Sequence, residues 1–303
     1  MQRLIYFKSD LMNDKPFSPR IDRNYPKPKL KVPEGSCDCH FHFIGPQSQF
    51  PLLTDHVFNH LQFEDTTFDD WERMQSGLGL SRGLHVQSMM YGKNYELALH
   101  AQCRYPDRIR TVISLPWDEI TDKELQILTD LGVVGARVSW RIENKLNPKM
   151  IERLTGFGWS IHYLIRTADL ETDWAKVILD TPGNFVIEHT GYPPADKGPE
   201  GAEFKFVLDC LDTGRGWVKL SPRFSNQEDF PFDDTNAFIF KLLDAAPERL
   251  LWGSDWPHPQ YFKPMPNDVG LLDMLLDWIP NEQTRKLILV DNPTDLFNFP
   301  KLG

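Results

Sequence analysis

Residues 36 to 45 read Ser-Cys-Asp-Cys-His-Phe-His-Phe-Ile-Gly, and this stretch predicts the first strand of the fold. Asp38, His40 and His42 alternate with less polar neighbours, and residues two apart in a β-strand project from the same face. The two imidazoles are therefore expected side by side at one end of the strand. The opposite face, which we expect to pack under helices, carries Cys37, Phe41 and Phe43. Taken alone, the His-x-His pair fits a solvated strand as well as a functional site.

The chain after this strand repeats a helix followed by a strand. Helices are expected at residues 67–80, 95–105, 121–131, 148–155, 170–180, 201–211 and 234–246. The strands after them are expected at residues 83–88, 109–115, 133–139, 159–165, 184–189, 217–221 and 249–254. Eight strands alternating with helices predict an α/β fold, the (β/α)8 TIM barrel.

The first 35 residues differ from the rest. They hold five prolines and no sustained hydrophobic period. We therefore expect residues 1–35 to form an extended N-terminal arm, lying on the body or on a second copy in a homo-oligomer. Residues 36–303 are expected to form the barrel, which would be the catalytic domain.

Composition excludes several classes of protein. The 303-residue chain has a formal net charge of -10, which argues against binding to nucleic acid. Its four cysteines show no paired spacing, as expected of reduced thiols in the cytoplasm. No stretch approaches the roughly 20 apolar residues of a membrane helix, and the start lacks the pattern of a signal peptide. We therefore expect a cytoplasmic enzyme with no membrane partner.

Polar residues gather where the predicted strands end. Active sites of such barrels lie at the carboxyl ends of the strands. A lone His or Asp at a strand end caps a turn about as often as it reacts, but convergence on one rim favours a site. The residues at these ends are His40, His42, Gln87, Ser88, Arg137, Ser139, His189, Lys219, Ser221, Arg223 and Asp255.

Three motifs carry a resemblance to a known family. They are Asp38-x-His40-x-His42, His189-x-Gly191 and Trp252-Gly-Ser-Asp255-Trp-Pro-His258-Pro. In this order and spacing they resemble the amidohydrolase superfamily, and most closely its amidohydrolase-2 branch, over residues 33–298. Within the branch, the chain is similar to 2-pyrone-4,6-dicarboxylate lactonase and to sugar-acid lactone hydrolases and isomerases. The resemblance implies a catalytic centre made by His40, His42, His189 and Asp255.

The resemblance leaves the cofactor open. Metal-dependent members supply a further ligand from the end of strand five, and here that position falls on Leu164. His162 lies about 6.6 Å lower, at about 3.3 Å per residue. The lactonases of this branch work without metal, which favours no cofactor. Three imidazoles and a carboxylate also suit one zinc or manganese ion, whose ligands would then be His40, His42, His189 and Asp255.

Lactone hydrolysis assigns a role to each group. It needs a base that activates water and a group that polarises the carbonyl. Asp255 is the expected base, and His189, with His40 and His42, would polarise the carbonyl.

The predicted substrate is a small anionic lactone. An arginine holds a carboxylate with two parallel hydrogen bonds, and the expected binding residues are Arg137, Arg223, Arg141, Gln87, Ser88 and Tyr91. For Arg141, a salt bridge to Glu143 is an equal alternative. Other functions remain open: a sugar-acid lactone isomerase, a metal-dependent hydrolase or decarboxylase, and an inactive barrel that only binds.

Overall fold

The computed structural model describes residues 15–116, 119–143, 145–228, 230–259 and 267–301. Eight parallel strands follow one another around a single sheet in chain order. They are β1 (Cys37–Phe41), β2 (Arg82–Val86), β3 (Ile109–Ile113), β4 (Val133–Ser139), β5 (Ser160–Leu164), β6 (Phe185–Ile187), β7 (Gly216–Leu220) and β8 (Leu250–Trp252). Backbone hydrogen bonds beyond β8, from Asp255 N to His40 O and from His42 N to Trp256 O, bring the last strand back to the first. The predicted (β/α)8 barrel is confirmed.

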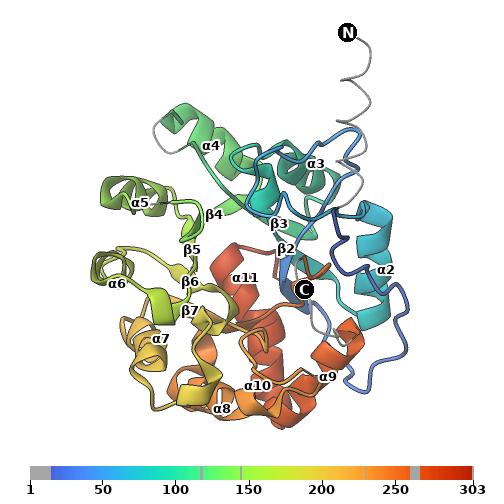
Figure 1. Cartoon of the computed structure of the whole chain (residues 1–303), viewed down its shortest axis with the longest axis vertical. Helices are drawn as coiled ribbons and strands as arrows, with labels where there is room; N and C mark the ends of the chain where they lie inside the picture. The colour runs from blue at the N-terminus through green and yellow to red at the C-terminus, as the bar shows by residue number, and fades with distance from the viewer. Residues whose placement is uncertain (1–14, 117–118, 144, 229, 260–266, 302–303) are drawn as a thin grey trace.

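Helices surround the strands (Figure 1). They are α2 (Phe68–Leu78), α3 (Glu96–Arg104), α4 (Asp122–Asp130), α5 (Pro148–Gly156), α6 (Thr172–Leu179), α7 (Ala202–Asp212), α8 (Asn236–Ala245), α9 (Asp268–Trp278), α10 (Glu282–Lys286) and α11 (Asn292–Phe297). A capping box formed by Thr121 and Glu124 begins α4, the helix that we expect at residues 121–131. None of the described helices has the length and apolar character needed to cross a bilayer.

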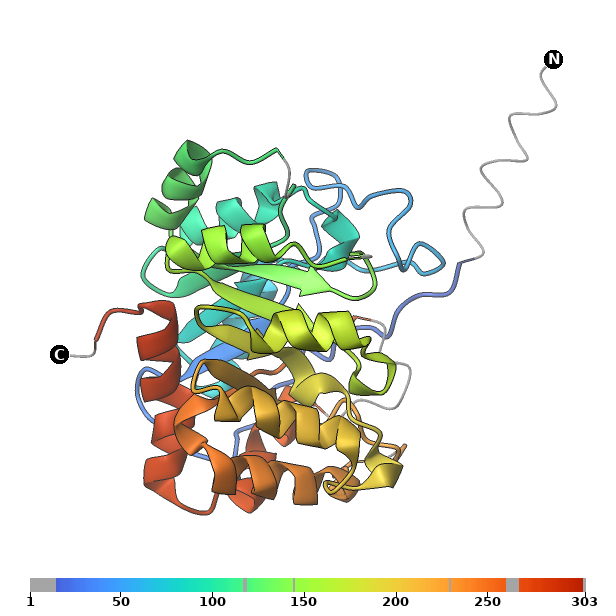
Figure 2. The ribbon, with the colours of Figure 1, turned by 90° about the vertical axis from the view of Figure 1, so that its left-hand side faces the viewer.

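The two ends of the barrel differ. Leu296 and Phe297 of α11 pack with inward side chains of the strands. Figure 2 shows α11 at the end from which the strands begin, with the carboxyl ends of the strands facing the other way. The amino end is therefore plugged by apolar side chains, and the carboxyl end is left for a site.

The first strand departs from our expectation at Cys37. The pairing of β1 with β2 shifts between Asp38 and Phe41, and a bulge of this kind moves the following side chains to the other face. Cys37, which precedes the bulge, packs inside the barrel with residues such as Val86. Phe41, in contrast, stacks on Trp71 of α2. The expectation that Cys37 and Phe41 share a face is wrong.

The N-terminal segment lies only partly within the described residues. Residues 1–14 of the predicted arm are outside them, and residues 15–35 contain no helix or strand. This stretch contacts the barrel helices: Arg23 pairs with Asp70 of α2 at 2.9 Å, and Leu30 N donates to Asp273 of α9 at 2.9 Å.

Candidate active site

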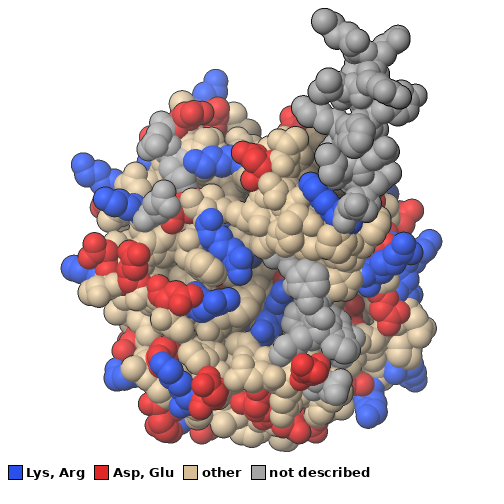
Figure 3. All heavy atoms as spheres, in the orientation of Figure 1, with Lys and Arg blue, Asp and Glu red and all other residues tan. Residues whose placement is uncertain are grey.

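A cavity of about 150 Å³ opens at the carboxyl ends of the strands. The charged side chains in its wall are four arginines and one carboxylate: Arg137, Arg141, Arg166, Arg223 and Asp255. The remaining wall includes His42, His189, Ser88, Phe58, Met89, Trp140, Leu164 and Tyr192. Figure 3 views this end of the barrel, and Lys and Arg side chains gather around the hollow at its middle. The described part of the cavity is strongly cationic and therefore suited to an anionic ligand.

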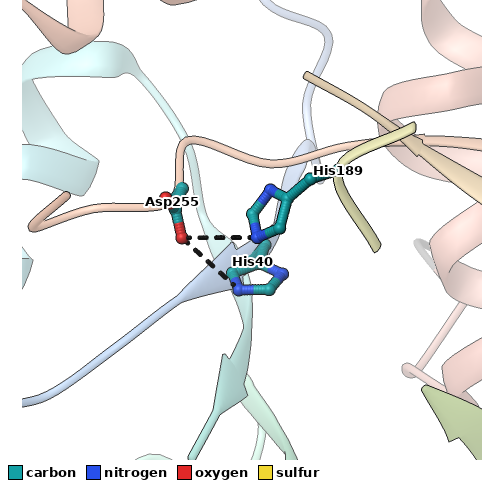
Figure 4. A group of neighbouring side chains, drawn as sticks. All are labelled: His40, His189 and Asp255. Carbon is teal, nitrogen blue, oxygen red and sulfur yellow. Dashed lines mark ion pairs between the residues drawn. The ribbon is translucent and has the colours of Figure 1, made fainter. Parts of the chain in front are cut away.

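The predicted catalytic residues come together beneath this cavity. The Asp255 Oδ1 atom lies 3.5 Å from His40 Nε2, 3.4 Å from His42 Nε2 and 3.7 Å from His189 Nε2. Figure 4 shows His40 and His189 pointing toward this carboxylate. All four side chains are buried. The arrangement implied by the resemblance is present in the fold.

The backbone is strained at Asp255 and at His189, the two residues that follow β8 and β6 and carry side chains into this cluster. Both residues adopt left-handed conformations, with φ of 64° and 50°, which few non-glycine residues adopt. The β6 strand ends at Ile187, earlier than expected, because the chain turns at His189. Asp38 links β1 to the Asp255 segment by accepting hydrogen bonds from His40 N and Ser254 N, at 3.0 and 2.9 Å.

Burial keeps the imidazoles neutral. It lowers the pKa of His42 to about 3. Burial also lowers the pKa of His40 well below the usual value, and the nearby Lys219 ammonium adds to this effect. Burial lowers the pKa of His189 in the same way, and there the main nearby cation is Arg223. A neutral imidazole carries one ring proton and one lone pair, so each can donate at one nitrogen and accept at the other.

A buried ion-pair network, which was not predicted from the sequence, lies below the three histidines and Asp255. The Glu188 Oε2 atom accepts from Arg137 Nε and Nη2 at 3.0 and 2.7 Å. Lys219 Nζ lies 3.8 Å from Glu188 Oε1 and 3.1 Å from His40 Nδ1. Burial lowers the pKa of Lys219 to about 8. Burial opposes ionisation of Glu188, but Arg137 and Lys219 hold its pKa below the usual value.

The network changes the interpretation of Arg137. This arginine lines the cavity, but Glu188 takes the two N–H groups that we assigned to a substrate carboxylate. The third described bond of the guanidinium, from Nη1, goes to the Gln87 carbonyl at 3.2 Å. A signal for Glu188 was available, since it directly precedes His189 at the end of a predicted strand.

The other two predicted arginines, Arg223 and Arg141, line the cavity and have different partners. Arg223 Nη1 forms an ion pair with Asp255 Oδ2. The Arg141 guanidinium lies over the Trp140 ring, 4.6 Å from its centroid, while Glu143 accepts from Ser139 N at 3.0 Å. Arg166, which we did not single out, stands just past β5 and also lies over Trp140, at 5.5 Å.

Two predicted binding residues have structural contacts instead. Gln87 Nε2 donates to the carbonyls of Gly92 and Asn94, and its Oε1 accepts from Ser114 N. The Tyr91 hydroxyl accepts from Gly45 N. Neither side chain lines the cavity, whereas Ser88 does.

The donor atoms at the centre are spaced as metal ligands would be. His40 Nε2, His42 Nε2 and Asp255 Oδ1 lie 3.3, 3.5 and 3.4 Å apart in pairs. Ligands of a tetrahedral ion at about 2.0–2.1 Å are separated by about 3.3–3.4 Å. His189 is the fourth candidate, within 4.8 Å of the His40 and Asp255 atoms. By spacing alone, His40 and Asp255 could hold one metal ion together with either His42 or His189.

Strand five adds no ligand. Leu164 occupies the rim and lines the cavity. His162 lies deeper, where its Nε2 is 3.1 Å from Ser160 Oγ and its ring packs near Phe297 of α11. His162 is therefore part of the barrel interior.

Comparison with known proteins agrees with the motifs. A family model described as Amidohydrolase matches residues 37–299. A 4-sulfomuconolactone hydrolase of Rhizobium radiobacter is 31% identical over 277 residues, covering 88% of this chain and 91% of the relative. A 2-pyrone-4,6-dicarboxylate hydrolase of Comamonas testosteroni is 28% identical over 290 residues, covering 90% and 93%. A D-galactarolactone isomerase of Agrobacterium fabrum is 26% identical over 236 residues, covering 76% and 80%. The chain belongs to the amidohydrolase family.

Proposed function

We propose that this protein hydrolyses the lactone ring of a small substrate with two anionic groups, without a metal ion. The observation that carries this proposal is the cavity wall, where four arginines face one carboxylate. Two of the similar proteins are hydrolases of anionic lactones. Arg137, Arg223 and Arg166 are already paired with Glu188, Asp255 and Asp169. An anionic lactone would add a negative charge beside Arg141, whose guanidinium is partly withdrawn from solvent, whereas a neutral lactone would cover this cation without compensating it.

Asp255 is the base in this proposal. Its carboxylate takes a proton from water as the water oxygen bonds to the lactone carbonyl carbon. Arg223, paired with Asp255 Oδ2, keeps the carboxylate ionised and oriented. When the ring C–O bond breaks, the protonated Asp255 returns its proton to the leaving oxygen.

The carbonyl oxygen gains negative charge during attack and needs donors. His189 and the guanidinium groups of Arg141 and Arg223 line the cavity and supply them. His42 has a different role from the one we expected. Its Nδ1 lies 2.6 Å from the Val86 carbonyl, so Nδ1 carries the ring proton and Nε2 can only accept.

A metal ion is not needed for these steps. If one were bound by His40, His42, His189 and Asp255, it would supply a hydroxide nucleophile and a Lewis acid. The cationic wall and the Arg223–Asp255 pair both disfavour a divalent cation here.

Isomerisation is the second candidate, because one relative is a lactone isomerase. In that reaction a substrate hydroxyl replaces water as the nucleophile, and the same residues serve. The two reactions differ in the source of the oxygen in the product.

The experiment is turnover in H₂¹⁸O. Purified protein is incubated with 2-pyrone-4,6-dicarboxylate, 4-sulfomuconolactone and galactarolactone, and products are analysed by mass spectrometry. We expect a ring-opened product with one ¹⁸O in the new carboxylate, formed about 10²–10⁴ times more slowly by Asp255→Asn. Conversion to an isomeric lactone without ¹⁸O would support the isomerase instead. No turnover of any anionic lactone would overturn the proposal.

A further inference from the structure

A row of buried polar groups crosses the floor of the site, from β7 to β2. Lys219 Nζ lies 3.1 Å from His40 Nδ1. His40 Nε2 lies 3.3 Å from His42 Nε2, and His42 Nδ1 lies 2.6 Å from the Val86 carbonyl. Lys219, His40 and His42 are 1%, 1% and 3% exposed as whole residues. Water therefore has little access to them, and each must satisfy its hydrogen bonds within the row.

The two ends of the row determine where the ring protons lie. The Val86 carbonyl can only accept, so His42 carries its proton on Nδ1 and a lone pair on Nε2. The Lys219 ammonium can only donate, so His40 accepts at Nδ1 and carries its proton on Nε2. His40 Nε2–H then faces the lone pair of His42 Nε2, and every contact within the row, from Lys219 to the Val86 carbonyl, joins a donor to an acceptor.

The ammonium has a reason to be charged in this position. Glu188 Oε1 lies 3.8 Å from Lys219 Nζ, and also 3.8 Å from His40 Nδ1. No hydrogen-bond partner within the described residues reaches this oxygen. A neutral amine would leave that carboxylate oxygen, buried and ionised, with less compensation.

We propose that Lys219 is a positioning residue that keeps the ring proton of His40 on Nε2 and thereby prevents the cluster from binding a divalent metal. The inference rests on the proposed metal-free lactone hydrolysis and gives its structural cause. A metal ligand must offer a lone pair, and His40 Nε2 has none in this arrangement. Moving the proton to Nδ1 would place an N–H donor 3.1 Å from the Lys219 donor.

A purely structural role for Lys219 makes a different prediction. If Lys219 only balanced the charge of Glu188, its loss would lower stability but leave the cluster unable to bind metal. If Lys219 controls the His40 proton, its loss frees that proton to move to Nδ1, toward Glu188. The atoms of His40, His42 and Asp255 are already spaced for an ion, so metal uptake should follow.

The test measures zinc uptake by the full-length protein. Wild type, Lys219→Met and Lys219→Arg are dialysed against zinc, then against buffer, and analysed for metal. We expect about one zinc per chain in Lys219→Met and a trace in wild type and in Lys219→Arg, which keeps a donor. Lys205→Met, at an exposed lysine of α7 paired with Asp209, is the matched control and should bind none. Folded Lys219→Met without zinc, or wild type with a full equivalent, would overturn the proposal.

A second measurement needs no variant at position 219. Long-range ¹H–¹⁵N spectra of histidine-labelled wild type report which ring nitrogen carries the proton, and His40→Gln identifies the His40 signals. We expect the proton of His40 on Nε2. A proton on Nδ1 would overturn the inference even if Lys219→Met does not fold. The ¹⁸O experiment tests lactone hydrolysis independently, so failure of one proposal is distinguishable from failure of the other.

Discussion

Replacing Arg141 with methionine tests whether the cationic wall binds the substrate. Methionine can still cover the Trp140 ring, over which the guanidinium lies at 4.6 Å, so packing changes little while one positive charge is lost. Burial lowers the pKa of Arg141, which indicates that the guanidinium is partly withdrawn from solvent. A hydrogen bond to a charged group contributes about 1.5–3 kcal/mol. At about 1.4 kcal/mol per factor of ten, kcat/KM for a dianionic lactone should fall about 10- to 150-fold.

Replacing Arg166 with methionine is the comparison for Arg141→Met, because the two arginines line the same cavity but differ in exposure. Its side chain is 48% exposed and already faces Asp169 at 3.5 Å, so its bond to substrate is screened and shared. Exposed pairs contribute about 0–1 kcal/mol, so Arg166→Met should cost no more than about fivefold.

The assay compares kcat/KM for a dianionic lactone with that for its uncharged diester. Arg141→Met should affect the diester little, and Arg153→Met, which removes an arginine paired with Asp122 outside the cavity, should affect neither substrate. Equal losses on both substrates would refute the reasoning, and so would a larger loss in Arg166→Met than in Arg141→Met.

Three further predictions concern the buried groups. Asp255→Asn should lower kcat by about 10²–10⁴, the contribution of a general base, with an unchanged circular dichroism spectrum; near-normal turnover would remove Asp255 from the mechanism. Glu188→Gln should lower the free energy of unfolding in urea by about 3–5 kcal/mol, because Arg137 is left buried and uncompensated. Asp169→Asn removes the acid of an exposed ion pair and should lower the free energy of unfolding by only about 0–1 kcal/mol. Equal losses in Glu188→Gln and Asp169→Asn would contradict the role of the buried pair. The pH profile of kcat/KM, corrected for spontaneous hydrolysis, should show no imidazole step near pH 6.5, because burial lowers the pKa of His42 to about 3. Activity should fall above about pH 8, because Lys219 loses its proton there and no longer holds the ring proton of His40 on Nε2. A rise in activity through pH 6.5 would instead argue for a charged imidazole.

The barrel was predictable because its signals are local. Apolar strands alternate with capped helices, such as the one that begins at Thr121, and each repeat can be read without knowledge of the others. The rim position of His40, His189 and Asp255 then followed from a general property of barrels. The resemblance to the family assigned Leu164 to the end of strand five, and β5 ends at Leu164.

What the sequence did not predict depends on contacts between distant segments. The bulge in β1 places Cys37 and Phe41 on opposite faces of the strand, and no residue of the strand itself predicts the bulge. Arg137 was predicted to bind substrate, and nothing in the sequence indicated that the fold would place Glu188 against its Nε and Nη2 groups. Gln87 and Tyr91 follow the end of a predicted strand, as site residues do, but their side chains form hydrogen bonds with backbone groups of nearby segments. Those backbone groups need partners when they are buried.

The most direct test of the central claim is the metal content of the purified protein, measured together with lactonase activity before and after chelation. Protein with less than about a tenth of an equivalent of transition metal and unchanged activity would agree with Asp255 activating water in a cationic, metal-free site. One equivalent of zinc or manganese, with activity lost on chelation and restored by the metal, would contradict it. His40, His42, His189 and Asp255 would then be metal ligands.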